Sequence, residues 1–198
     1  MSSIKLKLLD IRSRLQIKRY LKNLDVSDVS IISMNCIGGI VYHDCKSKFL
    51  SPTVNLFFTP GDFIKFVNNL EYYLALTPEV FMGKQYPIGK IGDITVFFMH
   101  YDSCESALSK WEERKARINF EKIFVIMVER DGFSKTDFEN FKNIKYPKLL
   151  FTRNKEYDCE CSFYMPKYKN LEQLPDIIPG RHMYDKGVLV KKINSAFK

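Results

Sequence analysis

The sequence predicts an α/β protein built on a mostly parallel, three-layer (Rossmann-like) sheet with helices on both faces. Residues 94–99 (ITVFFM) and 123–128 (IFVIMV) are apolar throughout, which is typical of strands buried on both faces. Amphipathic helix patterns separate such runs, and this alternation indicates β-α-β crossovers. With 198 residues and 45% hydrophobic side chains, the chain can form one compact core. We expect a basic amphipathic helix at 1–24, an α/β core at 25–157, and an irregular C-terminal extension at 158–198 packed on that core.

The pattern of residues 1–24 predicts an amphipathic helix with a basic face. Ile4, Leu8 and Ile11 fall on one apolar stripe. The segment holds seven basic residues and one acidic residue, so it carries +6 of the net charge of +8. Such a helix can lie on anionic lipid, or it can dock on the core and leave its basic face in solvent. The rest of the chain is close to neutral, which argues against nucleic acid as a partner.

The composition favours a cytoplasmic location. No apolar run approaches the roughly 20 residues that span a bilayer, and the first residues lack the apolar stretch of a secretory signal. Five cysteines without the spacing of a disulfide framework fit a reducing compartment. If the helix at 1–24 binds lipid, the protein would be peripheral to the inner face of the cell membrane.

From residue 25 onward, strand and helix patterns alternate. Residues 29–33 (VSIIS) form a short β-rich run, and the residues after Gly39 could be a short helix or a loop. Residues 54–58 are a second apolar run, after which Pro60 suits the first turn of a helix. An apolar stripe over 63–74 extends that helix.

The second half continues this alternation. Ser103 can cap a helix that follows the first long apolar run and continues to about residue 117. After the second long run, Ser134 and Asp137 fit a capping box that opens another helix. Residues 148–151 are a last short strand.

The polar residues that follow each strand are the candidate site residues. Ligands of open parallel sheets bind beyond the carboxyl ends of the strands, so these residues would share one edge and could line a cleft. After the runs at 29–33, 94–99, 123–128 and 148–151 they are, in order, Asn35, Cys36, Gly38 and Gly39; His100, Tyr101 and Asp102; Glu129, Arg130 and Asp131; and Arg153.

Some of these side chains suit acid–base or cation chemistry. His100 could be a general base oriented by Asp102 or Glu129, or a hydrogen-bonded structural histidine. Glu129 and Asp131 could hold Mg²⁺ or Mn²⁺ against a diphosphate. Arg130 between them could bind phosphate or neutralise both carboxylates, and the same residues also suit a solvated turn. No other cofactor is indicated.

Other candidates have both a functional and a structural interpretation. Gly38 and Gly39 could let backbone N–H groups approach a phosphate, or they could form an ordinary tight turn. Cys36 could be a nucleophile or a small buried hydrophobe. Arg114 and Arg117 lie on one side of a predicted helix, where they could bind phosphate or remain a solvated face.

The C-terminal extension contains a Cys-x-Cys pair, Cys159 and Cys161. This is half of a zinc pattern, and His182 is not spaced to complete it. We therefore interpret the pair as structural or incidental.

Three stretches of the chain are similar to a known bacterial family. They are ISMNCIGGIVYHDCKSKFLSPTVNLFFTPGDFIKFVNNLEYYL (32–74), YPIGKIGDITVFFMHYDSCESALSKWEERKARINFEKIFVIMVERDGFS (86–134) and FTRNKEY (151–157). The chain resembles the family called domain of unknown function 1919, whose members are often labelled exopolysaccharide or capsule biosynthesis proteins. Met34 and Ile37 stand where members often have Asn and an aromatic residue. Positions that match the family motifs include Asn35, Cys36, Gly39, Asn55, His100, Tyr101, Arg114, Arg117 and Asp131.

The resemblance implies an α/β fold and an association with surface-polysaccharide gene clusters, without settling a reaction. We expect an enzyme of cell-surface glycan assembly, glycosyltransferase-like, that acts on a sugar nucleotide and a glycan acceptor. His100 or Asp102 would activate an acceptor hydroxyl, and Glu129 and Asp131 would hold a cation. The residues expected to bind substrate are Asn35, Cys36, Gly38, Gly39, Asn55, Tyr101, Arg114, Arg117, Arg130 and Arg153.

Two other interpretations remain open. The protein could be an acyl or phosphoryl transferase on the same glycan, in which Cys36 would matter more than the carboxylates. It could also be a non-catalytic accessory protein that binds a glycan or a lipid.

Overall fold

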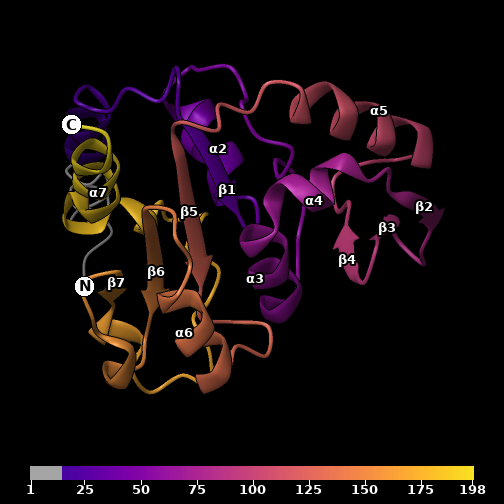
Figure 1. Ribbon diagram of the computed structural model, residues 1–198. Helices are drawn as coiled ribbons and strands as arrows, with labels where there is room; N and C mark the ends of the chain where they lie inside the picture. Colours follow the sequence, from indigo (N-terminus) through magenta and orange to yellow (C-terminus); the bar gives the residue numbers. More distant parts are fainter. Residues whose placement is uncertain (1–14) are drawn as a thin grey trace, which may run out of the picture.

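The computed structural model describes residues 15–198, and these form two β-sheets with helices around them (Figure 1). The larger sheet has the strand order β1-β5-β6-β7, and each neighbouring pair is parallel. Its strands are β1 (Ser30–Ser33), β5 (Ile123–Val128), β6 (Lys148–Thr152) and β7 (Ser162–Tyr164). The prediction of an α/β protein with a mostly parallel sheet is confirmed.

The smaller sheet is antiparallel and has the order β2-β3-β4. Its strands are β2 (Glu79–Met82), β3 (Pro87–Ile91) and β4 (Ile94–Phe97). The prediction that the ITVFFM run points along the parallel sheet is therefore wrong. Ile91 pairs with Ile94, so Gly92 and Asp93 form a two-residue hairpin loop, and Gly92 has a φ of +58°. Loops this short join antiparallel neighbours and need such positive φ values.

The helices match the predicted starts better than the predicted lengths. They are α2 (Ile37–Asp44), α3 (Pro60–Asn68), α4 (Leu70–Ala75), α5 (Cys104–Lys115), α6 (Lys135–Lys142) and α7 (Val188–Ala196). Ser103 and Ser134 cap α5 and α6 as predicted, because each side-chain oxygen accepts the N–H three residues further on. The helix expected over 60–74 breaks at Asn69 into two. Residues 54–58 form no strand and contribute only a bridge between Phe57 and Phe97.

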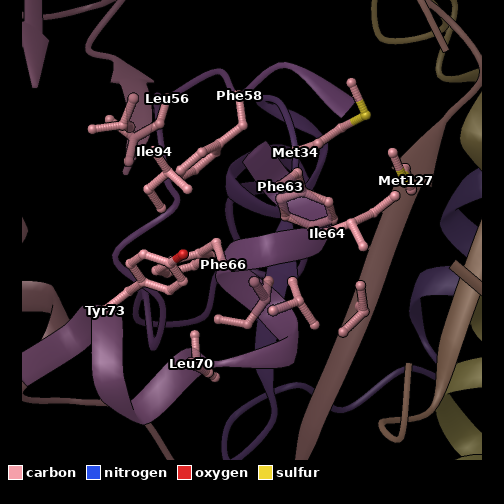
Figure 2. Packing of buried hydrophobic residues seen from close by; sticks show 14 of the residues in the cluster. Met34, Leu56, Phe58, Phe63, Ile64, Phe66, Leu70, Tyr73, Ile94 and Met127 are labelled. Atoms are coloured by element: carbon pink, nitrogen blue, oxygen red, sulfur yellow. The ribbon is translucent and has the colours of Figure 1, made fainter. Parts of the chain in front are cut away.

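The hydrophobic core forms two clusters, one on each side of β5, because successive side chains of a strand point to opposite faces. Val125 and Met127 pack with α3, α4, α5, α6 and β4. Figure 2 shows part of this cluster, in which the rings of Phe58 and Phe66 stack at 5.2 Å between centroids. Phe124, Ile126 and Val128 face the other cluster, which includes α2 and α7. The apolar pattern of β5 thus reflects burial on both faces.

The C-terminal extension is more regular than predicted. It contributes β7 to the parallel sheet and α7 to the second cluster. The 3-10 turns η1 (Lys155–Tyr157), η2 (Pro166–Tyr168) and η3 (His182–Gly187) lie between these elements. A strand of three residues carries too little pattern to be recognised in a sequence, which explains the missed element.

The described part of the N-terminal segment docks on the core. Residues 15–21 are helical, and Ile17, Tyr20 and Leu21 pack against the second cluster while Lys18 remains exposed. The part of the predicted helix before residue 15 lies outside the described residues. Of the helices described, none is long and apolar enough to cross a membrane.

Candidate functional site

A hollow of about 530 Å³ lies where the loops after β1 and β5 meet the end of β4. We call it the carboxyl-edge hollow, because β1 and β5 are parallel neighbours and both end there. Its polar lining residues are Asn35, Cys36, His100, Arg130, Asp131 and Asp176. The structure thus brings five of the predicted site residues together. His100 follows β4 of the antiparallel sheet. It therefore lies at the hollow for a different reason from the predicted one, which assumed that its strand is part of the parallel sheet.

The loop after β1 is fixed by its own hydrogen bonds. Ser33 Oγ donates to the backbone oxygen of Asn35 at 2.6 Å, and the Asn35 Oδ1 accepts the Ile37 N–H at 3.1 Å. The side-chain oxygen therefore forms an Asx turn that leads into α2, whose N-cap residue is Cys36. The Asn35 amide nitrogen makes no hydrogen bond to the described residues, so this donor is available to a ligand in the hollow.

Arg130 and Asp131 form an ion pair in the turn after β5. The Arg130 Nε donates to Asp131 Oδ2 at 2.9 Å, and the Asp131 N–H donates to Gln173 Oε1 at 2.8 Å. Asp131 and Gly132 have φ values of +59° and +86°, which turn the chain away from the strand direction. The guanidinium keeps unused donors for a second anion.

His100 lies exposed at the rim of the hollow. Neither Asp102 nor Glu129 lines the hollow, and within residues 15–198 no side chain hydrogen-bonds to the imidazole. The predicted carboxylate that would orient His100 is therefore not found. Asp102 is an exposed residue of the loop that leads into α5.

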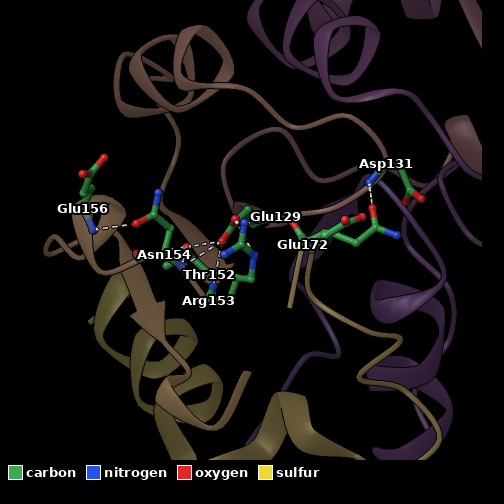
Figure 3. A network of polar contacts seen from close by, with 8 residues as sticks. Glu129, Asp131, Thr152, Arg153, Asn154, Glu156 and Glu172 are labelled. Carbon is green, nitrogen blue, oxygen red and sulfur yellow. Dashed lines mark hydrogen bonds and ion pairs between the residues drawn. The ribbon is translucent and has the colours of Figure 1, made fainter. Parts of the chain in front are cut away.

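Glu129 has a structural role in place of the predicted catalytic or metal-binding one (Figure 3). Its side chain is buried, and Oε2 accepts hydrogen bonds from the Thr152 hydroxyl at 2.6 Å and from the N–H groups of Arg153 and Asn154 at 2.7 and 3.0 Å. The carboxylate thus caps the end of β6. In the part of the chain that the structure describes, no three His, Cys, Asp or Glu side chains are placed to share a metal ion, so the pairing of Glu129 with Asp131 around a cation is not supported.

The glycine pair packs a helix against a strand. Gly38 and Gly39 are buried within α2, and a Cβ on Gly38 would lie 2.7 Å from Ser33 Oγ. The Gly38 N–H donates to that same oxygen at 3.0 Å. This amide is occupied, so the Gly38 N–H is not free to bind a phosphate.

Arg114 of α5 and Arg117, two residues after that helix ends, hold the segment before α3, away from the hollow. Arg114 is only 8% exposed, and its Nη1 donates to the Val54 oxygen at 3.0 Å and to the Tyr101 hydroxyl at 2.6 Å. That hydroxyl in turn donates to the same Val54 oxygen at 3.2 Å. Arg117 reaches the Phe49 oxygen at 3.5 Å. These contacts give Arg114 and Arg117 a structural role, because they bond to backbone oxygens of the segment before α3.

Two further residues that were expected to bind substrate, Asn55 and Arg153, also lie outside the hollow. Asn55 has a φ of +63°, a conformation that asparagine tolerates better than most residues. Arg153 donates to the Glu172 oxygen at 2.7 Å and lies 3.3 Å from the Glu129 carboxylate. Arg153 therefore ties the C-terminal extension to the edge of the parallel sheet.

Cys36 is held as a neutral thiol. Burial raises its pKa to about 11, and the negative charge of Asp176 adds to the effect. A nucleophilic cysteine needs the opposite shift. The structure thus weakens the interpretation in which Cys36 attacks a substrate.

Several lining residues had no signal in the sequence. Asp176 comes from the extension, whose pattern could not be assigned. Leu56, Phe57, Tyr86 and Met99 form an apolar and aromatic wall. Residues 56 and 57 were interpreted as part of a strand, and only the antiparallel pairing of β3 with β4 explains why Tyr86 and Met99 meet.

Comparisons with known proteins agree with the expected resemblance. Residues 9–194 match the model of a family described as "Domain of unknown function (DUF1919)". A Haemophilus influenzae (strain Rd) protein, described as "Uncharacterized protein", is 33% identical over 194 residues, which cover 93% of this chain and 94% of that protein. Neither description mentions a polysaccharide, so that association stays an expectation.

Proposed function

The chain belongs to the DUF1919 family of domains of unknown function, and from the carboxyl-edge hollow we propose that it is a transferase acting on a sugar nucleotide and a glycan acceptor. The observation that carries the proposal is the convergence of His100, Arg130 and Asn35 on one hollow with an apolar wall. Small-molecule sites commonly combine such walls with a few convergent polar groups.

The wall supplies the shape that a nucleotide or sugar requires. Phe57 and Tyr86 present aromatic side chains to the hollow, and each packs against the ring of Phe97, at 5.5 and 6.4 Å between centroids. This support holds the rings in place before a ligand arrives. Bases stack on such rings with about 1–3 kcal/mol each, and the apolar face of a sugar can pack in the same way.

The polar groups of the hollow suit a glycosyl transfer, which needs a base for the acceptor hydroxyl and a positive charge for the departing diphosphate. The acceptor oxygen would attack the anomeric carbon while the bond from that carbon to the diphosphate breaks. His100 would take the proton of the acceptor hydroxyl, and Arg130 would neutralise the departing diphosphate. Asp131 would then share the guanidinium of Arg130 with the diphosphate, since one guanidinium can donate hydrogen bonds to both anions.

Calorimetric titration with a panel of sugar nucleotides, with and without Mn²⁺, tests the proposal. We expect one donor class to bind, and Arg130→Gln to weaken it by about tenfold or more, because a charge-assisted hydrogen bond is lost. Arg19→Gln, on the exposed face of the N-terminal helix, is the matched control and should bind normally. Absence of heat with every donor would contradict the proposal.

A second candidate function is binding without catalysis. It is favoured by the absence of a described partner that orients His100 and by the neutral state of Cys36. Mass spectrometry of donor and acceptor after incubation with the protein separates the two functions. If a donor binds and no transfer product forms, and His100→Gln binds as tightly as the wild type, the protein is a binding module.

A further inference from the structure

A second cavity lies at the opposite edge of the parallel sheet, where β5 and β6 begin. It has a volume of about 600 Å³ and is bounded by the chain before β6, the turn before β7, and α7. We call it the amino-edge cleft. The charged residues that line it are Lys142, Lys145, Lys148, Lys192 and Glu160. Four lysines and one glutamate thus line the cleft, and this excess of positive charge favours an anion.

Two thiols also line this cleft. The sulfur atoms of Cys159 and Cys161 are 3.1 Å apart, and both side chains are partly buried. All five cysteines are free thiols, and this is the only pair in sulfur contact among the described residues. Contact between two sulfur atoms is the arrangement from which a disulfide forms without a large movement.

A tight turn holds the two thiols together. The Ser162 N–H donates to the Cys159 oxygen at 3.1 Å, and the Cys159 N–H donates to the Ser162 hydroxyl at 2.8 Å. The Leu150 N–H donates to the Cys161 oxygen at 2.9 Å, which fixes the second cysteine to β6. The backbone is therefore set before any reaction of the side chains.

The surroundings do not supply a zinc site. No third His, Cys, Asp or Glu within residues 15–198 completes a metal cluster with the pair. His182, considered earlier as a partner, contacts Lys167 at 2.9 Å instead. Exchange between thiols and a disulfide is the chemistry that needs two cysteines and no further ligand.

The lysines differ in how free they are to meet a ligand. Lys148 donates to the Ile144 oxygen at 2.6 Å and Lys192 to the Glu160 oxygen at 2.6 Å, while Lys142 pairs with Glu139 at 2.7 Å. Lys145 is exposed, and no ion pair joins it to a described residue. Its ammonium group is the one that an incoming anion can use without breaking an existing contact.

We propose that Cys159 and Cys161 are a redox-active dithiol that exchanges with a small anionic disulfide bound in the amino-edge cleft. The Cys159 thiolate attacks one sulfur of the incoming disulfide, forms a mixed disulfide and releases the first thiolate. Cys161 then attacks the Cys159 sulfur, its proton passes to the second departing thiolate, and an intrachain disulfide remains. The protein loses two electrons and two protons, and the small disulfide becomes two thiols.

Burial and the contact with Cys159 both affect the protonation of Cys161. Burial raises its pKa to about 12, and the hydrogen bond and charge of the neighbouring Cys159 act in the same direction, while Lys148 opposes them. Cys161 thus keeps its proton and can donate it toward the Cys159 sulfur. We assign the first attack to Cys159 as part of the proposal, and the two single-cysteine variants below test this order.

Mass spectrometry of the full-length reduced protein, incubated with glutathione disulfide and digested with trypsin, tests the chemistry. Both cysteines fall in the peptide 156–167, which should lose two hydrogen atoms. Cys161→Ser should stop at a mixed disulfide on Cys159, and Cys159→Ser should react at least about tenfold more slowly. Cys45→Ser is the control and should behave as the wild type. An unchanged peptide mass in the wild type, or equal behaviour of both variants, overturns the proposal.

A second measurement tests the cleft. Lys145→Glu should slow the reaction with glutathione disulfide by about threefold or more, because an attractive charge is reversed. The same variant should react normally with 2-hydroxyethyl disulfide, which is uncharged. Equal rates of wild type and variant with both disulfides would overturn the assignment of the anion to the amino-edge cleft.

Discussion

The two edges of the parallel sheet have different contents. The carboxyl-edge hollow combines an apolar wall with charges of both signs, since Arg130, Asp131 and Asp176 all line it. The amino-edge cleft is basic and holds the two thiols in sulfur contact. The hollow is assembled from segments far apart in the sequence, whereas most of the cleft comes from residues 142–161. The direction of parallel strands therefore predicts where polar residues from distant segments converge. A tight turn within one segment can bring reactive side chains together at another edge of the same sheet.

The largest expected difference between the two edges is in thiol reactivity, with Cys36 at the carboxyl edge reacting slowly and the Cys159–Cys161 pair at the amino edge proposed to be reactive. With a pKa of about 11, Cys36 should be alkylated by iodoacetamide at pH 8 roughly a hundredfold more slowly than in the unfolded chain. A raised thiol pKa means that the rate should climb with pH until about 11. Asp176→Asn should speed the reaction about twofold, because a nearby negative charge is removed. Peptide mass spectrometry measures these rates, and fast modification of Cys36 at pH 8 would remove the distinction.

The two carboxylates after β5 should differ in their effect on stability. Glu129→Gln should lower the free energy of unfolding by about 2 kcal/mol, because a buried carboxylate that accepts three hydrogen bonds is replaced by an amide. Asp131→Asn should change it by less than about 0.5 kcal/mol, since its ion pair with Arg130 is partly exposed. Urea unfolding monitored by circular dichroism checks both. Similar losses for the two variants would mean that Asp131 is structural as well.

Glycine packing beside the hollow should give a smaller effect than the loss of the Glu129 carboxylate. Gly38→Ala should cost about 1–2 kcal/mol of stability, because its Cβ would lie 2.7 Å from Ser33 Oγ. Gly61→Ala is the matched control, since the nearest atom to its Cβ would be 3.9 Å away. It should be neutral or slightly stabilising within about 0.5 kcal/mol. Thermal unfolding of both variants provides the comparison, and a neutral Gly38→Ala would reopen a role of this glycine in binding.

Sequence reasoning predicted the elements whose signals are local. β5 was found because six apolar residues in succession indicate burial on both faces, and α6 because Ser134 and Asp137 form a capping box. The expected common direction of the parallel strands also indicated that Asn35 and Arg130 would lie at the same edge. These features depend on periodicity and hydrogen-bond chemistry that a single segment contains.

The missed features depend on contacts between distant segments. β4 was assigned to the wrong sheet because Gly92 and Asp93 were not recognised as a hairpin loop. Arg114 resembles a solvated or ligand-binding arginine in the sequence, and only the folded chain shows it bonded to Val54. Asp176 could not be linked to the hollow, because nothing in its own segment indicates where the extension returns to the sheet.

The late contribution of the extension has a consequence for biosynthesis. The Leu174 N–H donates to the Glu129 oxygen at 2.9 Å, and Asp176 and Ile178 then complete the wall of the hollow. A nascent chain that has emerged only as far as β6 already contains His100 and Arg130 but lacks Asp176 and Ile178. Recognition of a ligand there must therefore wait until the ribosome has delivered residues 174–178.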